Sequence, residues 1–153
     1  MSNKQFVGYW KLRSMHFAEP SEMILNAGAP YGLRNDVGFH PWGISVDGRL
    51  CYSEDGDVVT ILGRQGRPPA SSPFVPLWTP DEALALVKEC TSYFGTYLVD
   101  PTVQLVHHDV RFSLNTAEPS RLSRKYAFID GQLILTAPTL FGELSLIWGR
   151  STP

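Results

Sequence analysis

The sequence has little cysteine, little charge and no long apolar run. Of its 153 residues, two are cysteines and 18% are charged, with a net charge of −2. Cys51 and Cys90 lie far apart in no metal-ligand spacing, which favours reduced thiols in a cytoplasmic protein. No stretch approaches the roughly 20 apolar residues of a membrane span, and the first ten residues do not resemble a signal peptide. We therefore expect a cytoplasmic protein with no membrane partner.

Several functional motifs are also missing. There is no run of lysine or arginine that could follow a phosphate backbone, so nucleic acid is not an expected partner. No G-x-G-x-x-G, P-loop or G-x-S-x-G pattern follows a predicted strand. His107, His108 and Asp109 are adjacent, and adjacent strand residues point to opposite faces, which disfavours one shared metal ion. Neither a cofactor nor a metal is expected.

Aromatic, glycine and proline residues are plentiful instead. Aromatic residues make up 12% of the chain, and 13 glycines and 12 prolines divide it into short segments of alternating polarity. Many short strands with aromatic filling favour a closed sheet over a helix bundle. The sequence predicts a mainly β fold: one domain over 1–153, forming an up-and-down antiparallel β-barrel of eight or nine strands.

One segment has the pattern of a helix. Thr79 can cap its first turn, Pro80 suits the first helical position, and Glu82 completes a capping box. Apolar residues then recur at helical spacing until Gly95. The prediction is a single α-helix over about 80–94.

Two dipeptides and two longer segments predict the connections. Asp47-Gly48 and Asp130-Gly131 each stand between strand-like runs and predict tight hairpin turns. Residues 18–36 and 64–78 are rich in glycine and proline but also hold apolar residues. Loops of this length usually have a function, and we expect these two to lie at the open mouth of the barrel.

The two ends of the chain carry a family resemblance. Gly8-Tyr9-Trp10 opens the first strand as G-x-W, and Trp148-Gly149-Arg150 closes the last one. Together with the segments VDGRLCYS, TPDEALALVKECTSYFGTYLVD, VQLVHHDVRFSL and RKYAFIDGQLILTAP, they resemble the lipocalin-like domain family of calycin-type barrels. The resemblance implies that Trp10 plugs the closed end and that Arg150 packs over it. The family includes members from fungal and bacterial biosynthetic clusters, which implies a role on a polyketide- or terpenoid-type intermediate.

Strand alternation predicts which side chains face the interior. In the first strand, Trp10 and Leu12 place Ser14 and His16 on the inner face. In strand 103–113, the more apolar set, which includes His108 and Phe112, is expected to point inward. A register error of one residue would reverse this assignment.

Three residues are the candidate acid–base groups. His108, flanked by valines, is expected to be largely neutral, although it could equally be a structural histidine. An inward Glu54 would have a raised pKa and could act as a general acid, unless it lies in the exposed turn that follows. Tyr126 is the third candidate. The residues expected to bind the substrate are Trp42, Tyr52, His40, His16, Arg124, Phe112 and Phe128. Arg124 could pair with a carboxylate or enolate oxygen, or form an outward salt bridge.

Three functions fit these observations. The barrel could be a cofactor-free cyclase or isomerase that acts on a hydrophobic intermediate. It could instead carry or sequester such a ligand without chemistry. In the third interpretation, its own side chains fill the interior and the protein is an interaction module. Both a monomer and a homodimer are compatible with the sequence.

Overall fold

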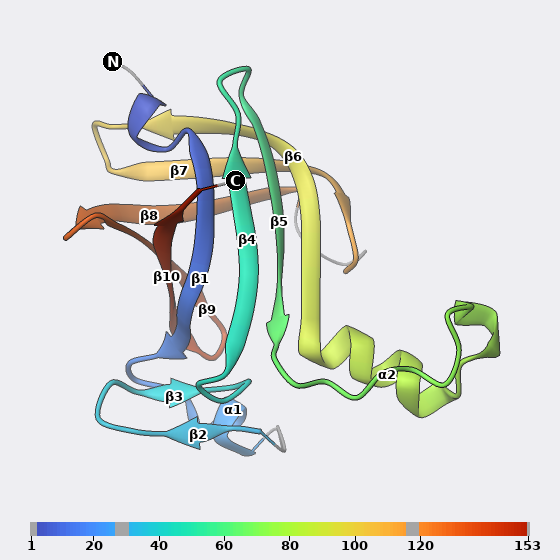
Figure 1. Ribbon diagram of the computed structural model, residues 1–153. Coiled ribbons are helices and arrows are strands. Elements are labelled where there is room, and N and C mark those ends of the chain that lie inside the picture. Colours follow the sequence, from blue (N-terminus) through green and yellow to red (C-terminus); the bar gives the residue numbers. More distant parts are fainter. Residues whose placement is uncertain (1–2, 27–30, 116–119, 153) are drawn as a thin grey trace.

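The first and last strands pair with each other and close the sheet. In this computed structural model, which describes residues 3–26, 31–115 and 120–152, β1 (Gly8–Phe17) pairs antiparallel with β10 (Gly142–Ser151). The order around the wall is β1, β4, β5, β6, β7, β8, β9, β10. The predicted mainly β barrel is confirmed, with eight strands in the ring and two short strands outside it (Figure 1).

The other elements are short. The remaining barrel strands are β4 (Val46–Tyr52), β5 (Asp57–Arg64), β6 (Cys90–Asp100), β7 (Leu105–Ser113), β8 (Arg121–Ile129) and β9 (Gln132–Thr139). Outside the ring lie β2 (Leu33–Arg34), β3 (Phe39–His40), the helices α1 (Glu22–Asn26) and α2 (Pro80–Glu89), and the 3₁₀ turns η1 (Asn3–Gln5) and η2 (Val75–Leu77). Part of the predicted loop 18–36, residues 27–30, lies outside the described residues. No helix in the described part of the chain is long and apolar enough to cross a bilayer.

The predicted helix starts in the right place but ends early. The Thr79 hydroxyl accepts a hydrogen bond from the Glu82 amide, and the Glu82 carboxylate accepts one from the Thr79 amide, so the capping box is present. However, α2 ends at Glu89, and the chain continues as β6 from Cys90. The extension of the helix to residue 94 was wrong because β6 pairs with strands on both sides, and threonine and aromatic residues favour such a pleated surface.

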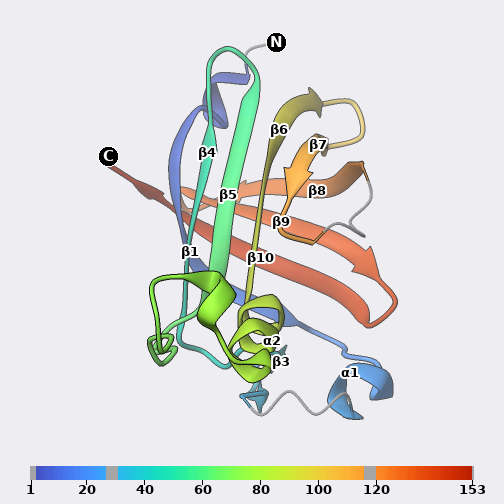
Figure 2. The same ribbon diagram turned by 90° about the vertical axis from the view of Figure 1, so that its right-hand side faces the viewer.

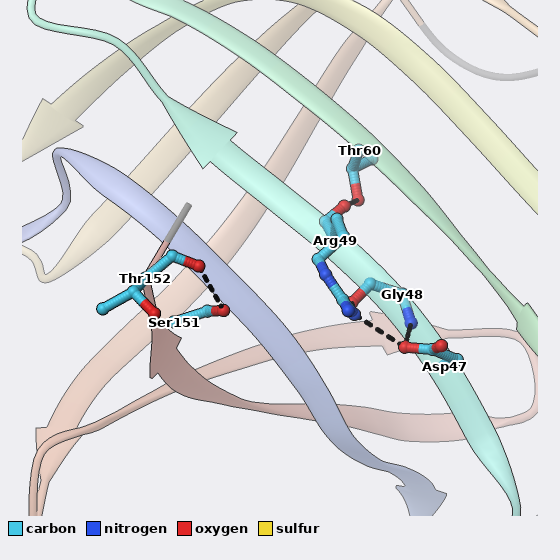
Figure 3. Close-up of polar contacts among 6 residues, drawn as sticks. All are labelled: Asp47, Gly48, Arg49, Thr60, Ser151 and Thr152. Atoms are coloured by element: carbon cyan, nitrogen blue, oxygen red, sulfur yellow. Dashed lines mark hydrogen bonds and ion pairs between the residues drawn. The ribbon is translucent and has the colours of Figure 1, made fainter.

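Asp47-Gly48 does not form the predicted turn. Both residues lie inside β4, where the Asp47 carboxylate accepts hydrogen bonds from the Gly48 amide and the Arg49 guanidinium (Figure 3). On the neighbouring strand β5, the Thr60 hydroxyl donates a hydrogen bond to the Arg49 carbonyl and so links the two strands. A Cβ on Gly48 would lie 2.7 Å from the Cβ of Leu62. The glycine therefore permits close strand packing and does not provide a turn.

Both long insertions lie at the same end of the barrel. One joins β1 to β4 and contains α1, β2 and β3, and the other joins β5 to β6 and contains α2. Figure 2 shows α1, β3 and α2 together at the end opposite the N-terminus. The two loops expected at the mouth therefore share one end.

Asp130 and Gly131 connect β8 to β9 with positive φ angles of 50° and 77°, as the predicted hairpin turn requires.

A β-bulge in β1 reverses the predicted alternation. Leu12 pairs with Trp148, but Ser14 pairs with Ile147, so Arg13 is the additional residue. Beyond the bulge, Met15 joins the core and pairs with Leu146. The inward placement of Ser14 and His16 was therefore wrong, because both now lie on the opposite face.

A second bulge has the same effect in β7. Phe94 of β6 pairs with Phe112, but Gly95 pairs with Val110, which leaves Arg111 as the additional residue. Phe112 is 68% exposed and stacks on Phe94 on the outside of the barrel, with ring centroids 6.0 Å apart. The prediction that Phe112 lines the interior was wrong, whereas His108, which precedes the bulge, does point inward.

Candidate functional site

The closed end of the barrel is plugged as predicted. Trp10 is 1% exposed, and its indole N–H donates to the Phe6 carbonyl at 2.8 Å. The Arg150 guanidinium lies 3.9 Å from the centroid of the Trp10 ring and donates to the carbonyls of Val7 and Gln5. The indole N–H of Trp10 and both terminal nitrogens of the Arg150 guanidinium thus have hydrogen-bond partners within the protein, and the cation–π contact joins the two side chains.

Hydrogen bonds link three inward-facing side chains in the barrel. Tyr52 of β4, His108 of β7 and Tyr93 of β6 all project from inward positions. The Tyr52 hydroxyl lies 2.7 Å from His108 Nε2, and the Tyr93 hydroxyl lies 2.6 Å from His108 Nδ1. Tyr52 and His108 are each 1% exposed, whereas Tyr93 is half-buried. Tyr93 is therefore the member of the triad that is partly exposed.

Burial keeps the two inner members of the triad neutral. Desolvation, with a smaller contribution from the Arg124 charge, lowers the pKa of His108 to about 3. Desolvation and the nearby Tyr93 hydroxyl raise the pKa of Tyr52 well above its usual value. The neutral imidazole matches the expectation from the sequence, but a pKa this low also makes His108 a weak base.

The number of protons on the imidazole determines which groups of the triad donate hydrogen bonds and which accept them. A neutral imidazole carries one N–H, so one tyrosine donates to the ring and the other accepts from it. Among the described residues, His108 is the hydrogen-bond partner of the buried Tyr52 hydroxyl. If Tyr52 accepted, its own proton would be buried without an acceptor, which costs about 1–3 kcal/mol. The favoured arrangement runs from Tyr52 O–H to His108 Nε2 and from His108 Nδ1–H to Tyr93.

Arg124 also projects from the inner face of β8. It pairs with Val106, next to the pair formed by Leu122 and His108, so Arg124 and His108 are diagonal neighbours across two strands. The outward salt bridge considered for Arg124 is absent from the described ion pairs, and its guanidinium donates at 3.3 Å to the Ser123 carbonyl. The register thus places Arg124 on the same face of the barrel wall as His108.

The other two candidate acid–base residues are not part of the triad. Tyr126 faces inward and packs edge-on against Phe6 and Phe128, toward the closed end. Phe128 likewise lines the wall, with its ring 6.1 Å from that of Trp10. Glu54 is exposed in the turn between β4 and β5, so the prediction of an inward carboxyl was wrong.

His16 and His40 form a separate pair outside the core. Their ring centroids lie 5.4 Å apart, and both residues are buried where β3 covers the end of β1. His16 lies close to the Ser14 hydroxyl, and His40 close to the Asn35 side-chain oxygen. Desolvation lowers the pKa of both rings. They tie the β3 segment to the barrel wall and do not line its interior with Tyr52.

Side chains from both insertions meet at the mouth. The Trp42 indole packs against the core and donates to the Lys88 carbonyl at the end of α2. Arg64, at the end of β5, forms a 2.9 Å ion pair with Glu89 and lies 3.7 Å from the centroid of the Tyr31 ring. The two insertions are thus joined to each other and to the barrel at this end.

Two surface hollows lie away from the triad. One of about 570 Å³ lies between α2 and the segment around Pro68, and is lined in part by Trp78 and Leu86. The other, of about 360 Å³, lies over β4 and β5 beside Arg49 and Ile61. Neither is lined by His108, so the interior site is defined by its inward side chains and not by these hollows.

The fold and the triad together define a class of protein. A closed antiparallel barrel with a tryptophan–arginine plug at one end and an aromatic interior is an architecture that holds small hydrophobic ligands. The chain matches the family described as lipocalin-like domain over residues 7–146 and belongs to that family. No curated protein matches the chain.

Sequence reasoning missed Tyr93. It was assigned to the end of the helix, where its side chain had no predicted role. The alternation of Tyr93, Gly95 and Tyr97 could have revealed the inner face of β6, since Tyr97 is also buried and donates to the Ser53 carbonyl. The error in the helix boundary concealed this signal.

Proposed function

We propose that this chain binds a hydrophobic small molecule inside the barrel and, without a cofactor, catalyses its cyclisation or isomerisation. The substrate would be a polyketide- or terpenoid-type intermediate of secondary metabolite biosynthesis. The observation that carries the proposal is that the Tyr52 and Tyr93 hydroxyls both lie within hydrogen-bond distance of the His108 ring. The two free thiols, Cys51 and Cys90, agree with a cytoplasmic location.

Tyr93 would act on the substrate directly. Donation from His108 Nδ1–H to the Tyr93 oxygen polarises the phenol and makes its own O–H a stronger donor. That donor can stabilise negative charge as it develops on a carbonyl oxygen in the transition state. The low pKa of His108 argues against direct proton abstraction by the imidazole. His108 and Tyr52 are therefore positioning residues, and Tyr93 is the catalytic residue.

The aromatic wall would provide shape. Tyr126 and Phe128 face the interior, and Trp42 packs against the core from the mouth. Holding an extended, unsaturated ligand in a folded conformation brings its reacting ends together and excludes water. This contribution requires no acid or base.

The second candidate is a carrier that performs no chemistry. The weak basicity of His108 favours it, because a binding protein needs hydrogen-bond donors but no base. The third candidate, a barrel filled by its own side chains, draws support from the edge-on contacts of the Phe6 ring with Tyr52, Tyr126 and Phe128.

A binding assay and a rate assay separate the three. Nile red, a neutral dye whose fluorescence rises in apolar sites, reports on binding. The linear trienone 1,7,9-decatrien-3-one, which closes to a bicyclic ketone by intramolecular [4+2] addition, reports on catalysis, followed by chromatography. Tyr93→Phe removes one hydroxyl from the triad. Tyr97→Phe is the matched control because its hydroxyl binds a backbone carbonyl outside the triad.

The proposed function predicts that the wild-type protein accelerates ring closure. Tyr93→Phe should lose most of that acceleration, about 100-fold where a single oxyanion donor is removed, while Nile red binding changes less than about threefold. Tyr97→Phe should keep the wild-type rate. Binding with no acceleration would establish the carrier, and an absence of Nile red binding would establish the filled barrel.

A further inference from the structure

Among the described strand residues, the inner face of the barrel carries a positive charge and no negative charge. Arg124 projects inward from β8 and is half-buried. In the described strands, the acidic residues occupy outward or terminal positions: Asp47, Asp57, Asp100, Asp109 and Glu143. The three ion pairs among the described residues use other arginines, namely Arg49, Arg64 and Arg121. The Arg124 guanidinium thus lies near enough to His108 and Tyr52 to affect their pKa values, and it has no carboxylate partner in the described chain.

A second inward-facing donor lies toward the closed end of the barrel. The Trp148 indole N–H is buried and has no acceptor among the described residues. Trp148 is 1% exposed and faces inward, between its strand partners Leu12 and Leu133. Arg124 and Trp148 can only donate hydrogen bonds, because a guanidinium and an indole N–H have no acceptor.

Such an interior selects a ligand by charge. A guanidinium that is partly removed from water binds most strongly to a group that neutralises it and accepts two hydrogen bonds. The diagonal position of Arg124 beside His108 places that group next to the triad. A neutral apolar ligand would instead leave the guanidinium without a counter-charge.

We infer that the ligand of this barrel is an amphipathic oxyanion, a carboxylate or an acidic enolate on an apolar body, whose charged oxygens bind Arg124 while the body fills the aromatic interior. This inference rests on the proposed function, because it names the chemical class of the molecule held in the barrel. It also predicts that the barrel binds a charged head group more tightly than a neutral one, a preference that the neutral Tyr93 hydroxyl alone would not produce.

Two matched pairs of probes test the inference. Dodecanoate and 1-dodecanol share a chain and differ in the charge of the head group. A 6-alkyl-4-hydroxy-2-pyrone, which is an acidic enol, and its 4-methoxy ether differ in the same way. Each is titrated against Nile red bound to the protein at neutral pH, so that displacement gives its affinity. The first pair tests a carboxylate and the second an enolate.

Three variants test whether the preference for an anionic ligand depends on Arg124. Arg124→Met keeps the length of the side chain and removes its charge, and Arg124→Lys restores a charge without the planar fork. Lys125→Met is the matched control, because Lys125 is the exposed neighbour on the outer face of the same strand. Thermal unfolding of each variant verifies that it is folded.

We expect at least one anion to bind at least tenfold more tightly than its neutral partner. Arg124→Met should remove this preference, Lys125→Met should keep it, and Arg124→Lys should keep part of it. If Nile red binds but both pairs show equal affinities, or if Arg124→Met keeps the preference, the inference is overturned while the proposed function stands. If Nile red itself does not bind, both are overturned.

Discussion

The closed end and the middle of the barrel are both lined by aromatic side chains, but they differ in how their polar groups are satisfied. At the closed end, Trp10 donates to a backbone carbonyl, and Arg150 stacks on its ring and binds two further carbonyls. In the middle, the Arg124 guanidinium has no carboxylate partner in the described chain.

We propose that this difference separates a structural region of the barrel from the region that binds the ligand. Buried polar groups in proteins are normally hydrogen-bonded, and an exception requires an explanation. The Trp10–Arg150 pair has its partners within the protein, so substitutions in this pair should affect stability. The Arg124 guanidinium has no counter-charge in the described chain, so substitutions around it should affect binding and rate.

The largest loss of stability should follow Trp10→Ala. Removing a 1%-exposed indole leaves a cavity at the closed end and removes the platform for Arg150. We expect a loss of about 3–5 kcal/mol in the free energy of unfolding. Urea denaturation measures it. A loss below about 1 kcal/mol would show that the plug does not hold the barrel together.

Acid should destabilise the protein through its buried histidines. The folded-state pKa of His108 is about 3, and those of His16 and His40 are also lowered. Below pH 6.5 the unfolded chain therefore binds more protons than the folded one, so stability is present above pH 6.5 and is lost as the pH falls. His108 alone contributes a slope of about 1.4 kcal/mol per pH unit down to about pH 3.

Urea denaturation between pH 7 and pH 4 tests this slope. His108→Gln, whose amide can still bond to both tyrosines, should flatten the curve. His107→Gln, a change on the outer face beside Ser123, should leave it unchanged. An equal flattening by both variants would contradict the assignment to His108.

Arg150→Met should have an intermediate effect. The variant keeps most of the packing on Trp10 but removes the cation–π contact and the bonds to Val7 and Gln5. We expect a loss of about 1–2 kcal/mol and an unchanged affinity for Nile red. If affinity falls with stability, then the two ends of the barrel are not independent.

The smallest effects should come from two residues that the sequence had placed inside. Phe112→Ser and Glu54→Gln change exposed side chains and should alter stability by less than about 0.5 kcal/mol. The rate of trienone closure should equal that of the wild type. A large loss of rate in either variant would require an interior role that the fold does not give them.

The sequence predicted the barrel fold better than it predicted which side chains face the interior. The capping box at Thr79 is a local signal and was confirmed, and so was the contact of Trp10 with Arg150 that the family resemblance implied. Asp47-Gly48 was misread because a glycine required for close packing against Leu62 has the same appearance in the sequence as a glycine required for a turn.

The errors in the lining have one physical cause. A strand alternates with period two only until a bulge inserts an additional residue, and bulges at Arg13 and Arg111 reversed the assignments of His16 and Phe112. The bulges depend on pairing with the neighbouring strand, such as the close approach of Gly95 to Asp109, which no single strand reveals.

The most direct test of the interior site is the ¹⁵N chemical shift of the four histidine rings, measured with and without a saturating barrel ligand. The ligand is 1-dodecanol or dodecanoate, whichever binds more tightly. We expect the ¹⁵N chemical shifts of the His108 ring to change when the ligand saturates the protein, while those of His16, His40 and His107 stay constant. An unchanged His108 in the saturated protein, with shifts at the other rings, would contradict it.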